Sequence, residues 1–199
     1  MTERGDWVGY YDEQGDRAPR DLLVGVLDRF EREGVTGAAV DLGCGQGIET
    51  AAMLARGWTV TAIDAQEDGI RRLRERVPLE SAGRLITRVS LMEDAELPPS
   101  DLVHASYSLP FCRPDAFPAL WGRVRDALRP GGRFAGELFG DRDTWASTED
   151  DMTFFGIDAA RTLFDGLDLE SFEEEESDDE GWGEIKHWHV FHAIARRPG

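Results

Sequence analysis

Apolar positions along the chain follow two patterns, a helical period in some segments and short continuous runs in others. Residues 20–34 carry apolar side chains at helical spacing between Leu23 and Phe30, and Gly34 ends the predicted helix. Short apolar runs predict buried strands at residues 38–42, 58–63, 85–91, 101–105 and 133–139. Helices are predicted between them at residues 48–56, 67–77 and 117–128. Strands that alternate with helices imply right-handed crossovers and a parallel sheet, which is an α/β fold.

The pattern changes after residue 139. Residues 159–164 predict a helix, and residues 169–174 and 186–195 predict two strands. Because no helix separates these strands, they should form an antiparallel hairpin. The segment between them, EEEESDDEGWGE, is strongly acidic. We expect it to lie in a solvated loop, and a cation site is the alternative.

The composition is that of a globular protein, with 41% hydrophobic and 31% charged residues in a chain of 199 that suits one domain. No apolar run approaches the ~20 residues of a membrane helix, and the polar start shows no signal peptide. Two cysteines are too few for a disulfide framework. We therefore expect a reduced, cytoplasmic protein.

The net charge of −18 comes from 22 basic and 40 acidic residues. Phosphate backbones are bound by basic patches, so this balance argues against nucleic acid as a substrate and against adhesion to anionic membranes. A high negative charge also favours solubility, so it identifies no partner by itself.

The stretch VDLGCGQGIETAAMLARGWTVTAID, residues 40–64, reads as a strand, a glycine turn, a helix and a second strand. This is the first crossover of a nucleotide-binding sheet. Glycines let the backbone approach a ligand closely, and the following helix points its N-terminus at that ligand. Asp64 closes the second strand and should lie beside the glycine turn, where its carboxylate can accept both hydroxyls of a ribose.

The spacing of the glycines separates two classes of ligand. In the dinucleotide fingerprint G-x-G-x-x-G, the third glycine would fall on Ile48 or on Thr50, so neither register fits. The pattern here is D-x-G-x-G-x-G, carried by Asp41, Gly43, Gly45 and Gly47. A carboxylate at the loop entrance would repel a pyrophosphate and would suit a ligand with an ammonium and a sulfonium group. A nicotinamide-dependent oxidoreductase is therefore disfavoured.

This pattern resembles the class I S-adenosylmethionine-dependent methyltransferases. SLMEDAELP after the third strand, ASYSLPF after the fourth and LRPGGRF before the fifth extend the resemblance over residues 38–139. YYDEQGDRAPRDLL near the start and KHWHVFHAIARR at the end are similar to a group of small bacterial methyltransferases labelled by analogy with tellurite-resistance methyltransferases. We do not carry tellurite over as a substrate.

The resemblance implies a Rossmann-like fold with a seven-stranded, mostly parallel sheet, an antiparallel last strand and helices on both faces. It also implies a single methyltransferase domain over residues 1–199, in which residues 1–20 form an N-terminal cover. No metal is implied.

The resemblance further implies the residues that bind S-adenosylmethionine. Residues 41–47 would wrap its methionine and ribose, with Cys44 as a small packing residue that supplies a backbone N–H. Asp64 would bind the ribose, and either Glu93 or Asp94 would meet the adenine. Tyr10 or Tyr11 would cover the cofactor, and Arg20 would pair with its carboxylate. The expected cofactor-binding residues are Tyr11, Arg20, Asp41, Gly43, Cys44, Gly45, Gly47, Asp64, Ala65, Glu93, Asp94 and Ser106.

The acceptor should lie at the carboxyl edge of the same sheet. Tyr107 and Phe111 follow the fourth strand, Asp143 and Trp145 follow the fifth, and these four residues are the candidates for acceptor contacts. The antiparallel last strand would begin at this edge. Its His187 and His189 share one face, and either can accept a proton near neutral pH. They are the candidate catalytic residues, and packing is the alternative; His104 and His192 are expected to be structural.

These features predict methyl transfer from S-adenosylmethionine to a small molecule. The motif Asn/Asp-Pro-Pro-Tyr/Phe of the methylases that modify amino groups of DNA and protein is absent. Oxygen, nitrogen and sulfur acceptors all remain open. The alternative is a protein that binds S-adenosylmethionine without catalysis, which predicts a blocked acceptor pocket.

Overall fold

The computed structural model describes residues 6–181 and 183–199. Residues 1–5 of the predicted cover and Trp182 of the predicted acidic loop lie outside the described residues. The α-helices are α1 (Trp7–Gln14), α2 (Asp21–Arg32), α3 (Ile48–Ala55), α4 (Glu67–Arg76), α5 (Leu79–Ala82), α6 (Phe117–Ala127) and α7 (Ile157–Thr162). Three short 3-10 helices, η1 (Met92–Asp94), η2 (Leu109–Phe111) and η3 (Thr144–Ser147), lie in connections. The strands are β1 (Ala38–Leu42), β2 (Thr59–Asp64), β3 (Leu85–Val89), β4 (Ser100–Ala105), β5 (Leu128–Gly140), β6 (Phe154–Phe155), β7 (Asp168–Gly181) and β8 (Glu184–Arg196).

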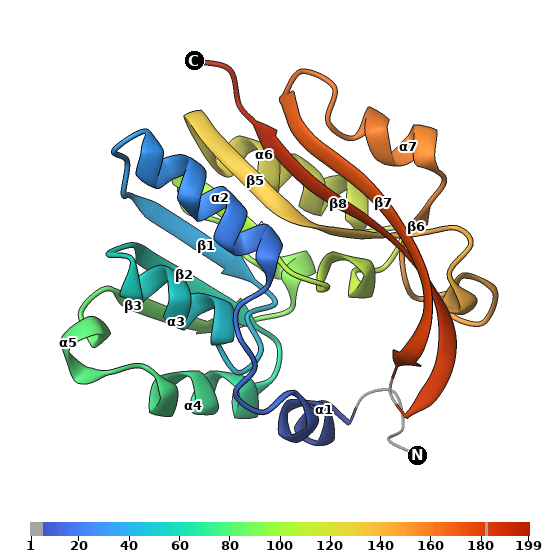
Figure 1. Ribbon diagram of the computed structural model, residues 1–199, viewed down its shortest axis with the longest axis horizontal. Coiled ribbons are helices and arrows are strands. Elements are labelled where there is room, and N and C mark those ends of the chain that lie inside the picture. Colours follow the sequence, from blue (N-terminus) through green and yellow to red (C-terminus); the bar gives the residue numbers. More distant parts are fainter. Residues whose placement is uncertain (1–5, 182) are drawn as a thin grey trace.

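The strands form one sheet in the order β3-β2-β1-β4-β5-β8-β7, and the two-residue β6 pairs with the end of β5 (Figure 1). The pairs from β3 to β5 are parallel, whereas β8 is antiparallel to both β5 and β7. The predicted Rossmann-like sheet with an antiparallel last strand is therefore confirmed, and the short β6 adds an eighth strand to the seven that were predicted. The carboxyl ends of β1, β2, β4 and β5 meet at one edge, together with the beginning of β8.

Apolar residues pack on both faces of the sheet. On one face α2, α3 and α4 bury one cluster, to which α2 contributes Leu23, Val26, Leu27 and Phe30 as the helical spacing predicts. On the other face α6 and α7 bury a second cluster around Trp121, Phe134 and Phe164. Figure 1 shows α2 and α3 in front of the sheet and α6 behind it. A third, smaller cluster around Phe139 and Val190 lies at the carboxyl edge.

The acidic segment is solvated, as predicted, since residues 173–176 and 178–180 are exposed, but most of it is strand and not loop. Strands β7 and β8 pair from Asp168 and Arg196 to Gly181 and Glu184, so most of the acidic run is part of a long antiparallel ribbon. The backbone ladder outweighs the low strand propensity of the acids. Repulsion between them is reduced by Arg142, which bonds to Glu174 and Glu176.

The predicted cover contains a helix that the apolar pattern did not reveal. Asp6 caps α1, since its side chain accepts a hydrogen bond from the Gly9 N–H at 2.9 Å. Helix α1 lies beside α4 and close to the end of the β7–β8 ribbon (Figure 1). It therefore closes one side of the carboxyl edge.

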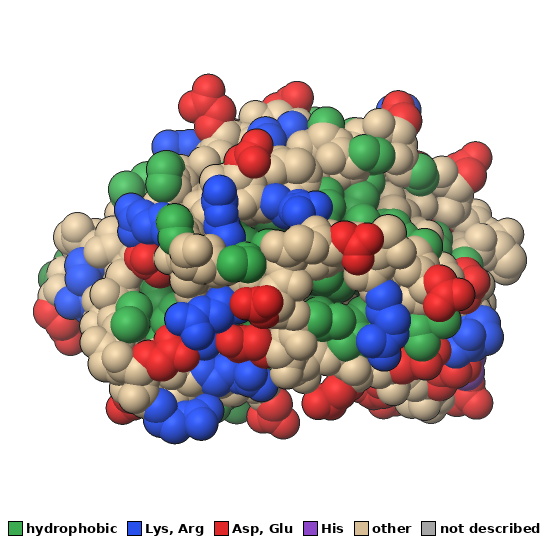
Figure 2. Space-filling view, turned by 90° about the horizontal axis from the view of Figure 1, so that it is seen from above, with side chains coloured by type: hydrophobic (Ala, Val, Ile, Leu, Met, Phe, Trp, Pro, Cys, Tyr) green, Lys and Arg blue, Asp and Glu red, His purple; other side chains and the backbone are tan. Residues whose placement is uncertain are grey.

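None of the helices in the described part of the chain has the length and hydrophobicity to cross a bilayer. On the face in Figure 2, acidic and basic side chains are interspersed, and no large basic patch is visible there.

Candidate active site

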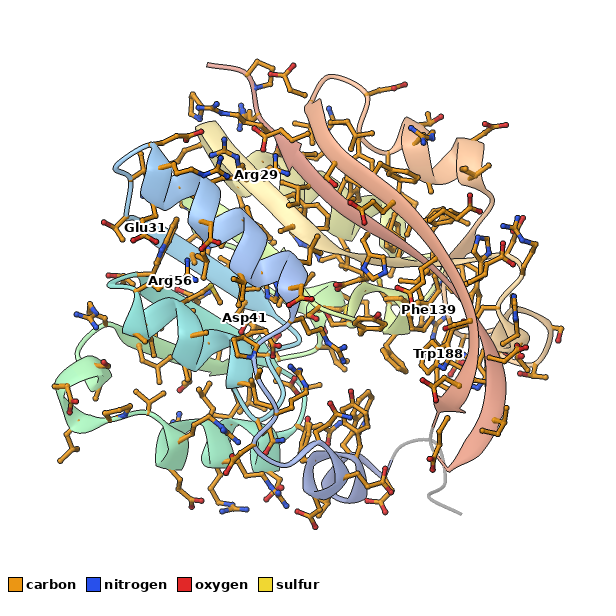
Figure 3. All side chains as sticks on the ribbon, viewed as in Figure 1. Arg29, Glu31, Asp41, Arg56, Phe139 and Trp188 are labelled. Carbon is orange, nitrogen blue, oxygen red and sulfur yellow. The ribbon has the colours of Figure 1, made fainter. Side chains whose placement is uncertain are left out.

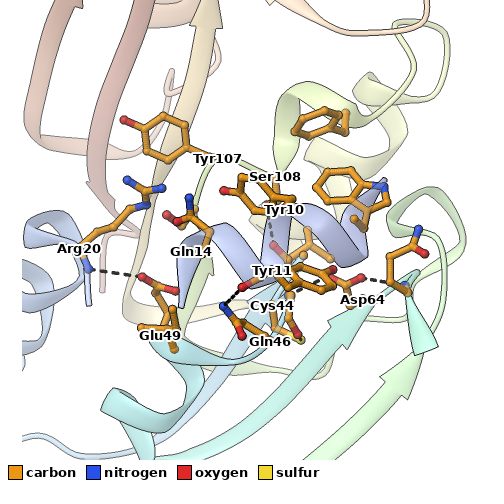
Figure 4. A pocket seen from close by; sticks show the side chains of 18 of the residues that line it. Tyr10, Tyr11, Gln14, Arg20, Cys44, Gln46, Glu49, Asp64, Tyr107 and Ser108 are labelled. Carbon is orange, nitrogen blue, oxygen red and sulfur yellow. Dashed lines mark hydrogen bonds between the residues drawn. The ribbon is translucent and has the colours of Figure 1, made fainter. Parts of the chain in front are cut away.

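A cavity of about 870 Å³ lies at the carboxyl edge of the sheet. Its walls come from α1, the β1–α3 loop, the segments after β2 and β4, and the inner side of the β7–β8 ribbon. Figure 4 shows that Tyr11, Asp64, Cys44 and Gln46 lie at one end and that Tyr107 lies further along, with Arg20 beside it. We call the region around the glycine loop, up to Arg20, the cofactor end, and the region from the Tyr107 ring onward the acceptor end.

The three glycines of the β1–α3 loop, Gly43, Gly45 and Gly47, all have positive φ, at +73°, +50° and +79°. Side chains rarely adopt this conformation. A Cβ at Gly43 would overlap Ser108, one at Gly47 would overlap Leu73, and one at Gly45 would lie 3.1 Å from the ring of Tyr11. The loop therefore needs glycine for its backbone shape and for close packing against its own chain.

The loop satisfies many of its own N–H groups. Those of Gly43 and Cys44 donate to the carbonyl of Ile63, and that of Gly47 donates to Cys44. Cys44 is thus a packing residue, but the prediction that its N–H is offered to the ligand is corrected. Burial, followed by the charges of Asp41 and Asp64, raises the pKa of the Cys44 thiol, so it stays protonated.

Asp41 anchors the beginning of the loop. Its Oδ2 accepts a hydrogen bond from Thr50 at 2.5 Å, and its Oδ1 lies 2.9 Å from Nδ1 of His104. Burial alone would lower the pKa of His104, but the hydrogen bond and charge of Asp41 outweigh it and raise that pKa. His104 is structural, as expected. Asp41 lines the cavity while both of its oxygens are engaged within the protein.

Asp64 lies beside the loop, as its position after β2 predicts. Its Oδ2 accepts from the Gly45 N–H at 2.7 Å, and its Oδ1 accepts from the Gln66 N–H at 2.8 Å. The side chain lines the cavity next to Ala65. Burial raises the pKa of Asp64, although the two N–H donors oppose the shift. The bonds fix the carboxylate at the point where β2 and the loop meet.

Helix α1 covers the cofactor end. Tyr11 is only 4% exposed and lies on Gly45. The Gln46 side chain holds the helix in place by donating to the carbonyls of Tyr11 and Gly15 at 3.0 and 3.1 Å. After the helix, Arg17 pairs with Glu49 at 2.7 Å. The placement of Tyr11 agrees with the predicted cover, and Gln46 and Glu49 are contributions that sequence reasoning missed.

Two buried donors in the cavity wall are without hydrogen-bond partners among the described residues. They are Nε of Arg20 and Oγ of Ser106. The guanidinium of Arg20 lies 4.2 Å from the centroid of the Tyr107 ring (Figure 4). Unpaired buried donors are costly, so a ligand with acceptor oxygens at this place would be favoured. An amino-acid carboxylate fits that requirement.

The two candidates for the adenine contact are separated by the structure. Glu93 lines the main cavity, whereas Asp94 lines a different, shallow hollow together with Arg88. Glu93 also accepts a hydrogen bond from the Arg113 N–H at 3.3 Å. The geometry therefore favours Glu93 and corrects the inclusion of Asp94 among the cofactor contacts.

Tyr107, Phe111 and Trp145, three of the candidates for acceptor contacts, line the cavity. Tyr107 has a φ of +50°, the only positive value at a non-glycine among the described residues, and its N–H donates to buried Glu137 at 3.0 Å. Burial and the charge of Glu137 raise the pKa of the phenol to about 12, against the effect of Arg20. The phenol is therefore protonated at neutral pH.

Further walls of the acceptor end come from strands whose cavity-facing side the sequence did not reveal. Phe139 at the end of β5, Trp188 and Val190 of β8, and Glu175, Ser177 and Asp179 of β7 all line the cavity. These residues are far apart in sequence. The alternation of residues 186–195 was visible in the sequence, but the face that meets the cavity was not, and residues 175–180 of β7 were expected to lie in a loop.

The two candidate bases lie on the opposite face of β8. His189 packs on Phe191, its Nε2 is 2.9 Å from Glu174, and its Nδ1 accepts from the Arg142 N–H. His187 bonds to Asp178 at 2.8 Å and to Glu176 at 3.0 Å. They share one face, as predicted, but neither lines the cavity. The geometry therefore corrects their assignment as general bases.

Asp143 also lies away from the cavity that it was expected to line. Its carboxylate accepts from the Trp145 N–H at 2.9 Å and pairs with Nζ of Lys186 at 2.6 Å, and it does not line the cavity. Asp143 thus supports Trp145 from outside the cavity.

The alternative of a cation site in the acidic segment corresponds to Glu174, Glu176 and His189, whose ligand atoms lie within 4.8 Å of one another. The guanidinium of Arg142 lies among these three side chains and bonds to each of them. The positive charge that this cluster stabilises is therefore already supplied by the protein.

Residues 39–132 match a family described as methyltransferase domain. A search of curated proteins gave no match. The matched range holds the glycine loop, Asp64, Glu93 and Tyr107, which are the residues that the structure brings to one cavity.

Solved structures share the fold. TehB from Haemophilus influenzae aligns with a TM-score of 0.73 and 17% identity over 87% of this chain, which spans 61% of the TehB chain. The 1,6-didemethyltoxoflavin-N1-methyltransferase of Burkholderia thailandensis, with bound 1,6-didemethyltoxoflavin and S-adenosylhomocysteine, aligns with a TM-score of 0.69 and 20% identity over 98% of this chain and 87% of its own. The N-methyltransferase NodS of Bradyrhizobium japonicum, in complex with S-adenosylhomocysteine, aligns with a TM-score of 0.69 and 16% identity over 92% of this chain and 90% of its own.

The family match covers the strand–loop–helix unit and the segments after β2, β3 and β4, and the structural neighbours extend the same fold over the rest of the chain. Residues 39–132 are therefore similar to a methyltransferase domain, and most of the chain shares the fold of solved methyltransferases.

Proposed function

We propose that this enzyme transfers the methyl group of S-adenosylmethionine to a small molecule bound at the acceptor end. The observation that carries the proposal is the continuity of the cavity, which runs from Asp64 and the glycine loop to Trp145 and Trp188. Its volume of about 870 Å³ is near the upper end of the roughly 300–1,000 Å³ range of ligand pockets. This leaves room for an acceptor beside the nucleoside.

The residues at the cofactor end fit the proposed ligand. The Asp64 carboxylate is placed to accept the ribose hydroxyls, Glu93 to accept the adenine amino group, and Arg20 and Ser106 to donate to the amino-acid carboxylate. When bound, S-adenosylmethionine supplies a methyl group on a positively charged sulfur. Tyr11 and α1 cover this end, which excludes water from the reacting groups.

The residues at the acceptor end position the nucleophile. Because the methyl group is already activated, correct placement can supply much of the rate enhancement. Within the described part of the chain, no histidine lines the cavity, and Tyr107 is protonated at neutral pH. The acceptor therefore binds as an intrinsic nucleophile or loses its proton to a carboxylate such as Glu175 or to water.

The neighbours from B. thailandensis and B. japonicum are described as N-methyltransferases. At 20% and 16% identity they share the fold, and the acceptor of this enzyme has to come from its own cavity. We propose nitrogen as the first acceptor atom to screen, ahead of oxygen and sulfur. We also propose that residues 1–20 act as the cover of a single methyltransferase domain.

Two measurements test the function. Calorimetry with S-adenosylhomocysteine should give a saturable heat; its absence at millimolar nucleoside would remove the proposal. Incubation with S-adenosylmethionine and pools of small amines, phenols and thiols should then release S-adenosylhomocysteine, detected by mass spectrometry. Tight nucleoside binding without turnover in any pool would favour the non-catalytic alternative.

A further inference from the structure

Three aromatic side chains, Phe139, Trp145 and Trp188, form one wall of the acceptor end, with Tyr107 beside them. We call these three residues the aromatic wall. The centroids of Trp145 and Trp188 are 5.4 Å apart, and those of Phe139 and Trp188 are 5.6 Å apart. Figure 3 shows Phe139 and Trp188 next to each other on the inner side of the ribbon. Aromatic faces carry negative electrostatic potential, so such a wall favours an apolar body and a positive charge.

The wall already contacts one basic side chain of the protein itself. Nζ of Lys186 lies 3.5 Å from the Trp145 centroid and 3.6 Å from the Trp188 centroid. Lys186 is 4% exposed and does not line the cavity, so it is buried behind the wall. Its charge is matched by buried Asp143 at 2.6 Å. The pair adds no net charge to the cavity, and the charge preference there is set by other groups.

Those groups are acids of β7. Glu175 and Asp179, with Ser177 between them, are spaced two residues apart along the strand, so they share the face that lines the cavity. Glu180 also lines the cavity. The ladder pairs Ser177 with Trp188 and Asp179 with Lys186, which places the acids next to the aromatic wall. Within the described residues, neither Asp179 nor Glu180 takes part in an ion pair, whereas Glu175 bonds to His192 at 2.9 Å.

Basic side chains do not balance these acids at the acceptor end. Arg17 and Arg20 are the described arginines that line the cavity. Arg17 is paired with Glu49, and Arg20 lies on Tyr107 with its free Nε, at the cofactor end. A carboxylate or phosphate on the acceptor would meet uncompensated negative charge, while an ammonium would meet carboxylates on one side and aromatic faces on the other.

We infer that the acceptor of this methyltransferase is a compact amine with an apolar body, bound as its ammonium cation between the aromatic wall and the carboxylates of Asp179 and Glu180. Its nitrogen passes a proton to Glu175 or to water, and the freed lone pair then takes the methyl group while S-adenosylhomocysteine leaves. The inference rests on the proposed function and names its substrate class. It assigns Asp179, Glu180 and Trp188 as specificity residues.

Choline and its uncharged carbon isostere 3,3-dimethyl-1-butanol test this inference, because they have nearly the same shape and differ in charge. Choline nitrogen has no lone pair, so binding is measured without transfer at that atom. Both probes are titrated by calorimetry into protein saturated with S-adenosylhomocysteine. We expect choline to bind at least tenfold more tightly than the isostere, and added salt to reduce the difference.

Variants locate the preference. Asp179→Asn combined with Glu180→Gln should reduce the choline preference at least threefold, and Trp188→Leu should weaken both probes. Asp178→Asn is the matched control, since Asp178 is the neighbouring acid on the other face of β7, bonded to His187. It should leave the preference unchanged. An equal loss in the control variant would place the effect in general surface charge and overturn the assignment.

The outcomes separate this inference from the proposed function. If S-adenosylhomocysteine binds and the two probes bind equally or not at all, the cation site is refuted and the methyltransferase function stands. The probes are also titrated without nucleoside. A protein that binds no nucleoside but still prefers choline would lose the proposed function and keep the cation site.

Discussion

At the cofactor end of the cavity, backbone conformation decides the shape, whereas at the acceptor end the contacts come from side chains. Gly43, Gly45 and Gly47 bend one short loop, and Asp64 is tied to that loop through the Gly45 N–H. The aromatic wall instead brings together residues from the end of β5, from η3 and from β8.

The difference has a physical consequence. A glycine loop tolerates few substitutions, because each added Cβ strains the backbone or overlaps a neighbour. A wall of side chains can change its chemistry one residue at a time while the strands stay in place. We therefore expect variants of the cofactor end to abolish nucleoside binding, and variants of the acceptor end to alter only which molecule is bound with it.

Gly45→Val tests the first half of this contrast and should have the largest effect. Valine at a φ of +50° strains the loop, and its side chain points at the Tyr11 ring. We expect the affinity for S-adenosylhomocysteine to fall by roughly 100-fold or more, about 3 kcal/mol, in calorimetry.

Gly34→Val is the matched control. Gly34 has a similar φ of +69°, a Cβ added there would meet no atom within 4 Å, and the residue lies outside the cavity. This variant should lose about as much thermal stability as Gly45→Val but keep its affinity for S-adenosylhomocysteine. Equal affinities for the two variants would show that the loop does not shape the ligand site.

Asp64→Ala removes a side chain at the same end and should have the next largest effect. Loss of a charged hydrogen-bond acceptor costs about 1–3 kcal/mol, so we expect the affinity for S-adenosylhomocysteine to fall roughly 5- to 150-fold. Titration with adenosine checks the assignment, because the ribose contact is common to both ligands. An unchanged affinity for both would remove Asp64 from the ribose site.

The same carboxylate predicts a dependence on pH. Burial raises the pKa of Asp64 above its ordinary value of 3.8, so its proton binds at a higher pH than in an exposed aspartate. The ribose hydroxyls donate to the ionised carboxylate. The affinity for S-adenosylhomocysteine should therefore fall as the pH falls through this raised pKa, by at most about tenfold per pH unit. The Asp64→Asn variant should bind weakly with a flatter profile; an identical slope would assign the dependence to another group.

Glu93→Ala and Asp94→Ala give a smaller and more local contrast. The two acids are adjacent in sequence, but only Glu93 lines the main cavity. We expect Glu93→Ala to weaken S-adenosylhomocysteine about fivefold, or about 1 kcal/mol, and Asp94→Ala to leave the calorimetric affinity unchanged. The reverse order would mean that the adenine lies toward the second hollow.

The same contrast explains what could be predicted from the sequence. The strand–loop–helix unit and Asp64 were predictable because one contiguous stretch encodes a backbone shape, and the helical spacing of Leu23 to Phe30 likewise revealed α2. The acceptor end was not predictable in the same way. A strand shows which residues share a face, but a shift of one residue exchanges His187 and His189 for Trp188 and Val190. The acidic run was misassigned because its strand pairing depends on β8.

His187→Ala should have the smallest effect, and its comparison with Trp188→Ala decides whether the facing of β8 is right. His187 is bonded to Asp178 and Glu176 outside the cavity, so we expect nucleoside affinity and kcat to stay within about twofold of the unmodified enzyme. Trp188 lines the cavity beside Phe139, and its loss should raise the acceptor KM with the nucleoside affinity unchanged. Both are measured with the first amine that proves to be a substrate. A residue on the outer face of β8 has no path to a proton at the acceptor. A tenfold fall in kcat for His187→Ala with no change in KM would therefore show that this facing is wrong and that His187 takes part in the catalytic step.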